Sequence, residues 1–160
     1  MSIGHFLGGV GACIYEPQIN KYLILLRSEY RDFGANQWEC LTGRVNQGES
    51  YTQALHREVY EEIGCSIKID FFIGTTHFFR GSENPENELL GVIYSCSILD
   101  KQIPKLGDEH STLRWVSANE VYEILPKGNW LYNTIRKAEM IRSQTTAELL
   151  EYFQREGFEI

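Results

Sequence analysis

Three glutamates, Glu58, Glu61 and Glu62, are the residues whose type and spacing most clearly suggest chemistry. On a helix with 100° per residue, they fall within an arc of about 100°. Acids three or four residues apart repel each other on a helix, so this arrangement does not stabilise one. A hard divalent cation such as Mg²⁺ or Mn²⁺ relieves that repulsion and prefers oxygen ligands. The spacing indicates a metal site, and a solvated acidic face is the alternative that these three residues alone leave open.

The residues around these acids form a longer pattern. Gly43 is followed by five residues and Glu49, then by seven residues and the run REVYEEIGC at 57–65. This pattern resembles the Nudix box, G-x5-E-x7-R-E-U-x-E-E-x-G-U, in which U is a bulky aliphatic residue. The one departure is Cys65 at the last aliphatic position. Because Cys is small and apolar, we expect looser packing there and no loss of chemistry.

The resemblance implies a fold and a reaction. The fold is an α/β/α sandwich with a mixed sheet and a loop–helix–loop catalytic box at 43–65. The reaction is the Mg²⁺-dependent hydrolysis of a nucleoside diphosphate linked to another moiety, with Mn²⁺ as a possible substitute. Bound metal ions would neutralise the diphosphate and lower the pKa of the attacking water. The other interpretation is a Nudix-fold module that binds a nucleotide without cleaving it.

The resemblance also implies a role for each matched residue. The metal ligands are Glu58, Glu61 and Glu62. Arg57 pairs with Glu49 and holds the box in register. Gly43 lets the backbone approach closely, and its carbonyl oxygen is a further candidate for metal contact.

The resemblance also implies one more acid from a late loop, ahead of a strand that contains Trp. Glu109 lies six residues before Trp115 and is our candidate, either as a metal ligand or as the general base. Its rivals are Glu86, Glu88 and Asp108. We interpret the neighbouring His110 as a bystander.

The substrate is less well specified. Arg44 and Arg27 are candidate phosphate contacts, with Arg31 and Arg80 as others, and Trp38 and Phe79 are candidates for stacking on a base. Core packing is the alternative for each aromatic residue. The segment WECLTGR at 38–44 resembles the W-E-x-P-A-G-K form of ADP-sugar hydrolases, but those enzymes tend to have a proline near position 80, which this chain lacks. A nucleoside triphosphate and an ADP-sugar therefore both remain open.

Alternating strands and helices must position these residues. Ser50 and Gln53 form a capping box, and Gly64 is placed to end the helix, which predicts a helix at 51–63. Strands are predicted at 5–15, 21–27, 37–42, 66–80, 88–99 and 113–116, and further helices at 118–125, 128–142 and 145–156. Strands mixed with helices in this way indicate a three-layer α/β/α architecture.

Length and composition set the remaining bounds. The 160 residues predict one domain, 1–160, and the net charge of −7 argues against nucleic acid as the partner. A small nucleotide remains compatible, with the protein as a monomer or homodimer. The chain has no apolar run long enough for a membrane span, and Met1 to Phe6 do not resemble a secretory signal. The four cysteines form no motif, so we expect buried free thiols and a cytoplasmic location.

Overall fold

The centre of the fold is a mixed sheet of seven strands, seen here in a computed structural model that describes residues 4–160. The expectation about the start of the chain depends partly on residues 1–3, which lie outside the described residues. No helix within residues 4–160 combines the length and the apolar character needed to cross a membrane.

The strands run in the order β3-β2-β1-β6-β5, with β4 also paired to β1 and β7 to β2. Only the β1–β6 pair is parallel among the pairs described. The strands are β1 (Leu7–Glu16), β2 (Lys21–Arg27), β3 (Trp38–Glu39), β4 (Leu41–Arg44), β5 (Ile67–Phe79), β6 (Glu88–Ile98) and β7 (His110–Val116).

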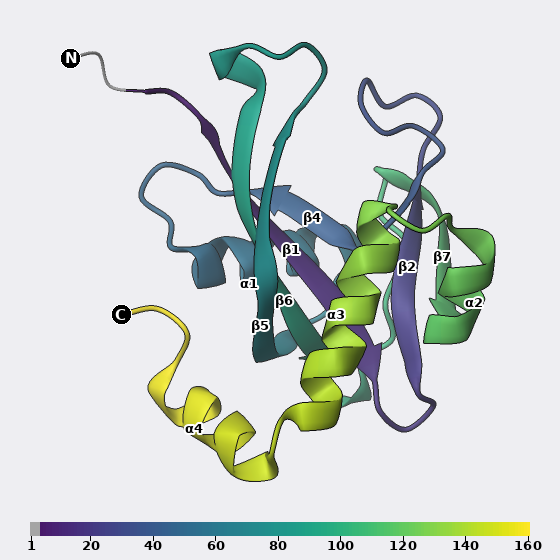
Figure 1. Cartoon of the computed structure of the whole chain (residues 1–160), viewed down its shortest axis with the longest axis vertical. Coiled ribbons are helices and arrows are strands. Elements are labelled where there is room, and N and C mark those ends of the chain that lie inside the picture. The colour runs from purple at the N-terminus through teal and green to yellow at the C-terminus, as the bar shows by residue number, and fades with distance from the viewer. Residues whose placement is uncertain (1–3) are drawn as a thin grey trace.

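Helices cover both faces of this sheet (Figure 1). α1 (Tyr51–Ile63) packs against β1 and β4, whereas α3 (Trp130–Gln144) packs on the other face, against β1 and β5. The short α2 (Ala118–Ile124) contacts α3, and α4 (Ala147–Glu156) contacts β5. The three-layer α/β/α architecture expected from the sequence is therefore confirmed.

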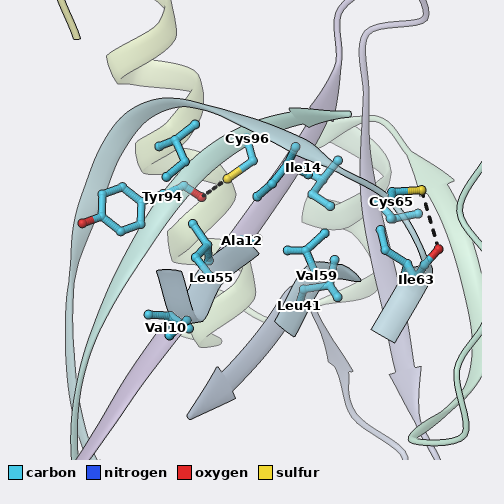
Figure 2. Packing of buried hydrophobic residues seen from close by; sticks show 14 of the residues in the cluster. Val10, Ala12, Ile14, Leu41, Leu55, Val59, Ile63, Cys65, Tyr94 and Cys96 are labelled. Atoms are coloured by element: carbon cyan, nitrogen blue, oxygen red, sulfur yellow. Dashed lines mark hydrogen bonds between the residues drawn. The ribbon is translucent and has the colours of Figure 1, made fainter. Parts of the chain in front are cut away.

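Alternating side chains of the central strands divide the core into two clusters. On β2, Leu23 and Leu25 belong to the cluster beneath α1, whereas Tyr22 and Ile24 belong to the cluster beneath α3. Successive side chains of a strand point to opposite faces, so a strand covered on both faces is apolar throughout. Figure 2 shows the first cluster, in which Leu55 and the other apolar residues of α1 meet the sheet.

The helix that holds the three glutamates begins and ends as the sequence predicts. The Ser50 side chain accepts a hydrogen bond from the backbone N–H of Gln53, and the Gln53 side chain accepts one from the N–H of Ser50. Gly64 ends the helix in the left-handed conformation, with φ of 68°, which glycine adopts without steric cost. α1 is therefore fixed at both ends by local interactions.

Two strand predictions differ from the structure near the site. The strand predicted at 37–42 is divided, because Trp38–Glu39 pairs with β2 whereas Leu41–Arg44 pairs with β1. The strand predicted at 113–116 begins earlier, at His110, because β7 continues its pairing with β2 as far as Arg27. Both differences bring buried polar residues, Glu39 and His110, into the sheet.

Candidate active site

Gly43, at the end of β4, contacts Glu58 of α1 directly. A Cβ atom on Gly43 would lie 2.1 Å from both Cγ and Cδ of Glu58. The backbone N–H of Arg44 donates a hydrogen bond of 3.0 Å to Oε1 of Glu58. The absence of a side chain at Gly43 therefore leaves the space that the Glu58 carboxylate occupies against β4.

Arg57 connects the acids of the box. It donates from Nε to Oε1 of Glu49 at 2.6 Å and from Nη2 to Oε2 of Glu49 at 2.9 Å. Its Nη1 atom lies 2.9 Å from Oε1 of Glu58 and 3.1 Å from Oε2 of Glu61. The Glu58 and Glu61 carboxylates therefore converge on a single point. These contacts lower the pKa of Glu49 to about 2, mainly through the hydrogen bonds from Arg57, and raise the pKa of Arg57.

Glu62 differs from the other two helix acids because its side chain is buried. Only 9% of that side chain is exposed, compared with 58% for Glu61. Burial raises the pKa of Glu62 to about 9, and the nearby charges of Glu109, Glu39 and Glu58 raise it further. Its Oε2 atom is buried and accepts no hydrogen bond.

This arrangement fits a divalent cation. Carboxylate oxygens are suitable ligands for Mg²⁺, and an unpartnered buried carboxylate oxygen is costly unless a positive group pairs with it. Within residues 4–160, no group of three or more acidic, His or Cys side chains is already close enough to enclose an ion. The positive group shared by Glu58 and Glu61 is Arg57.

Glu109 lies in the loop before β7 and is half-exposed. Its carboxylate forms an ion pair of 2.8 Å with Arg31, and its carbonyl oxygen accepts a hydrogen bond from the N–H of Ser28. Its charge contributes to the raised pKa of Glu62, which places it in the electrostatic surroundings of that acid. Of its rivals, Glu88 is paired with His77 at 2.9 Å, and Glu86 and Asp108 are exposed.

The structure does not bring all of the predicted substrate-binding residues together. Arg44 is exposed beside the box. Trp38 is half-buried, packs against the second core cluster and has the Arg114 guanidinium 5.7 Å from its ring centroid. Phe79 is half-buried beside His77 on β5.

Arg27, in contrast, borders a polar cavity of about 170 Å³ at one end of the sheet. The cavity is lined by Arg27, Tyr30, Arg31, Asp32, Phe33 and Arg80. The loop 28–37 and the β5–β6 hairpin extend from the same end of the sheet (Figure 1), and Phe33 stacks on Phe78 with ring centroids 6.0 Å apart. Trp38, Phe79 and Arg44 do not line this cavity.

The sequence reasoning missed two buried residues next to the box. Nε2 of His110 lies 2.8 Å from Oε1 of Glu39, and its other ring nitrogen lies 3.6 Å from Oε2 of Glu62. His110, interpreted as a bystander, is therefore in contact with a predicted metal ligand. One sequence signal pointed to Glu39. It precedes Cys40 and Leu41 in a segment predicted to be a strand, which indicates a buried carboxylate.

Comparison with known proteins shows the family to which this chain belongs. The family model described as NUDIX domain matches residues 5–138. A dihydroneopterin triphosphate diphosphatase from Haemophilus influenzae is 26% identical over 131 residues, covering 72% of this chain and 77% of the relative. An oxidized purine nucleoside triphosphate hydrolase from Danio rerio is 38% identical over 78 residues, covering 41% of this chain and 49% of the relative.

A solved structure gives the same fold. The MutT protein from Methanosarcina mazei Go1 superposes with a TM-score of 0.69 at 24% identity, covering 91% of this chain and 100% of that protein. The chain spans 33%, 19% and 49% of the lengths of the first three curated relatives that it matches. The family match, in contrast, extends over most of the chain and includes every residue of the box. This chain therefore belongs to the NUDIX domain family.

Proposed function

We propose that this protein hydrolyses a phosphoanhydride bond in a small nucleotide with the help of Mg²⁺. One observation supports the proposal most strongly. Glu58 and Glu61 converge on one atom of Arg57, and Glu62 on the same helix keeps a buried oxygen without a hydrogen-bond partner. Arg57 offsets the repulsion between Glu58 and Glu61 but makes no hydrogen bond to Glu62, and a divalent cation would neutralise all three of these hard oxygen donors.

Each side chain of the box has its own role in this proposal. Glu58, Glu61 and Glu62 would hold the cation, which would neutralise charge at the phosphates and make the attacking water more acidic. Arg57 and Glu49 fix the loop before α1 against the helix. Gly43 keeps the space beside Glu58 clear, and its carbonyl is a further ligand candidate. Glu109 is our candidate for the group that removes the proton from water, because its carboxylate is half-exposed and its charge acts on Glu62.

We further propose that the substrate is the triphosphate of a fused-ring base. Two relatives are named for ring triphosphates, a pterin and a purine. The cavity that Arg27 lines offers Arg80 for phosphate charge and Phe33 for a ring, and Arg31 lines it while paired with Glu109. The Arg80 guanidinium lies 5.7 Å from the Phe33 ring centroid, so cationic and aromatic groups are already adjacent there.

A product-resolved panel tests this proposal. The full chain is incubated with Mg²⁺ and each of dihydroneopterin triphosphate, purine and oxidised purine triphosphates, ADP-ribose and a dinucleoside tetraphosphate. We expect pyrophosphate and a monophosphate from at least one triphosphate, and turnover at least 100-fold lower in Glu61→Gln. Glu151→Gln, at an exposed acid of α4, is the matched control and should keep full turnover.

The outcomes separate the possibilities. Release of AMP from ADP-ribose alone would replace the triphosphate with an ADP-sugar. Binding of a nucleotide without turnover of any panel member would point to a sensor module and contradict the proposed hydrolysis.

A further inference from the structure

A buried chain of polar side chains extends from the sheet to the box helix. Arg27 on β2 donates to Oε1 of Glu39 at 2.9 Å. The same oxygen lies 2.8 Å from Nε2 of His110, whose Nδ1 lies 3.6 Å from Oε2 of Glu62. None of the four side chains is more than 10% exposed.

The backbone holds His110 firmly against α1. His110 is the first residue of β7 and pairs with Arg27 across an irregularity in the β2–β7 register. Gly107, three residues earlier, packs so closely that a Cβ atom there would lie 2.6 Å from the carbonyl oxygen of Glu62. The imidazole therefore has little freedom to move away from the Glu62 carboxylate.

The hydrogen bonds determine how the ring is oriented. Glu39 is paired with the permanently charged Arg27, and an ionised carboxylate can only accept hydrogen bonds. Nε2 of His110 must therefore donate to Glu39, which fixes the direction of the ring and turns Nδ1 toward Glu62. The separation of 3.6 Å between Nδ1 and Oε2 is longer than a hydrogen bond, and Oε2 accepts none, so the ring restricts the Glu62 side chain by packing against it.

We propose that His110, held by Glu39, is a positioning residue for Glu62 and thereby sets the affinity of the site for a divalent cation. The inference depends on the proposed function, since it assumes that Glu62 is a metal ligand. His110 does not touch substrate in this account. It keeps the Glu62 carboxylate in its buried position on the helix that also carries Glu58 and Glu61.

Two amide substitutions distinguish whether His110 positions Glu62 or only supports Glu39. The amide of Asn can occupy the place of Nδ1, whereas the amide of Gln reaches the place of Nε2. His110→Asn should keep the contact with Glu62, and His110→Gln should keep only the contact with Glu39. His110→Ala removes both, and His56→Ala, at an exposed His on α1, is the control.

The readouts are Mn²⁺ binding by electron paramagnetic resonance, kcat and KM on the best substrate of the panel, and the melting temperature without metal. We expect His110→Ala and His110→Gln to bind Mn²⁺ about 10–100-fold more weakly and to lose kcat similarly, with KM nearly unchanged. His110→Asn should keep most of the Mn²⁺ affinity and most of kcat, and His56→Ala should match the wild type.

Two results would overturn the inference. One is a folded His110→Ala variant with Mn²⁺ affinity and kcat within twofold of the wild type. The other is rescue by Gln and not by Asn, which would assign His110 to Glu39 and the sheet. If Glu61→Gln is inactive while His110→Ala is normal, the proposed hydrolysis stands and only the role of His110 is wrong. If His110→Ala does not fold, the Asn and Gln variants still decide the question.

Discussion

Gly43 and Glu58 lie so close together that a side chain on Gly43 would not fit: a Cβ atom there would lie 2.1 Å from the Glu58 Cδ. The contact joins the end of β4 to the middle of α1. It determines where one of the three helix carboxylates can lie, and it follows from the absence of a side chain.

Replacing Gly43 with Ala should displace Glu58 while the fold is kept. The clash is with a flexible side chain, so the strand can remain and the carboxylate must swing away from the N–H of Arg44. We expect kcat to fall at least 10-fold and stability to fall by about 1 kcal/mol, the typical value of one hydrogen bond. Steady-state kinetics and urea unfolding measure the two effects.

Gly74→Ala is the matched control, because a Cβ atom there would meet only Lys137 Nζ, at an ordinary 3.7 Å. Wild-type kcat in Gly43→Ala would show that Glu58 does not need its observed position.

The pair formed by Glu49 and Arg57 should make stability dependent on acid. The pKa of Glu49 falls from 4.5 to about 2 in the folded protein, so the folded state binds fewer protons than the unfolded state between these values. The contribution of Glu49 is therefore complete above pH 4.5 and is lost as the pH falls toward 2. Urea unfolding across this range should show a steeper loss in the wild type than in Glu49→Gln, with the two curves meeting near pH 2. Parallel curves would contradict the pairing.

Glu62 should have the opposite effect when no metal is present. Burial raises its pKa from 4.5 to about 9, so the folded state binds more protons and stability falls as pH rises through this range. In EDTA at pH 8.5, Glu62→Gln should be more stable than the wild type by on the order of 2 kcal/mol, because the folded wild type must keep Glu62 protonated at a pH at which the unfolded chain ionises it. The difference should shrink below pH 5 and reverse when Mn²⁺ is added. The difference between the two proteins appears in thermal unfolding as a shift of several degrees in the melting temperature. If the wild type and Glu62→Gln have equal melting temperatures at both pH values, the prediction is refuted.

The cavity arginines should affect substrate binding more than chemistry. Arg80 lines the cavity and lies over the Phe33 ring, away from the box acids. If it contacts phosphate, Arg80→Ala should raise KM about 10-fold, the equivalent of one charged hydrogen bond, with kcat within threefold. Arg155→Ala, at an exposed arginine of α4, controls for the loss of positive charge. An unchanged KM would exclude Arg80 from the substrate site.

The sequence predicts the box helix well because its determinants are local. Ser50, Gln53 and Gly64 set its ends, and the apolar spacing places Leu55 and Val59 in the core, where both are found. The four cysteines are free and buried, as expected. In these cases each residue type has one favourable environment, and its neighbours along the chain provide it.

The contact between Glu39 and His110 could not be found in the same way. The two residues are 71 positions apart and belong to strands that both pair with β2. No periodic pattern in the sequence indicates which histidine will be buried against which acid. The cavity beside Arg27 was missed for a similar reason, because a loop and a distant hairpin must meet to form it.

An anomalous difference map of crystals grown with Mn²⁺ and a non-hydrolysable triphosphate analogue tests whether the three glutamates of α1 bind a divalent cation. Our account predicts a strong peak bound by carboxylate oxygens of Glu58, Glu61 and Glu62, with Arg57 withdrawn from Glu61 and still paired with Glu49. A map with no peak among these oxygens, in which Glu58 and Glu61 remain on Arg57 while the nucleotide is bound elsewhere, would contradict it.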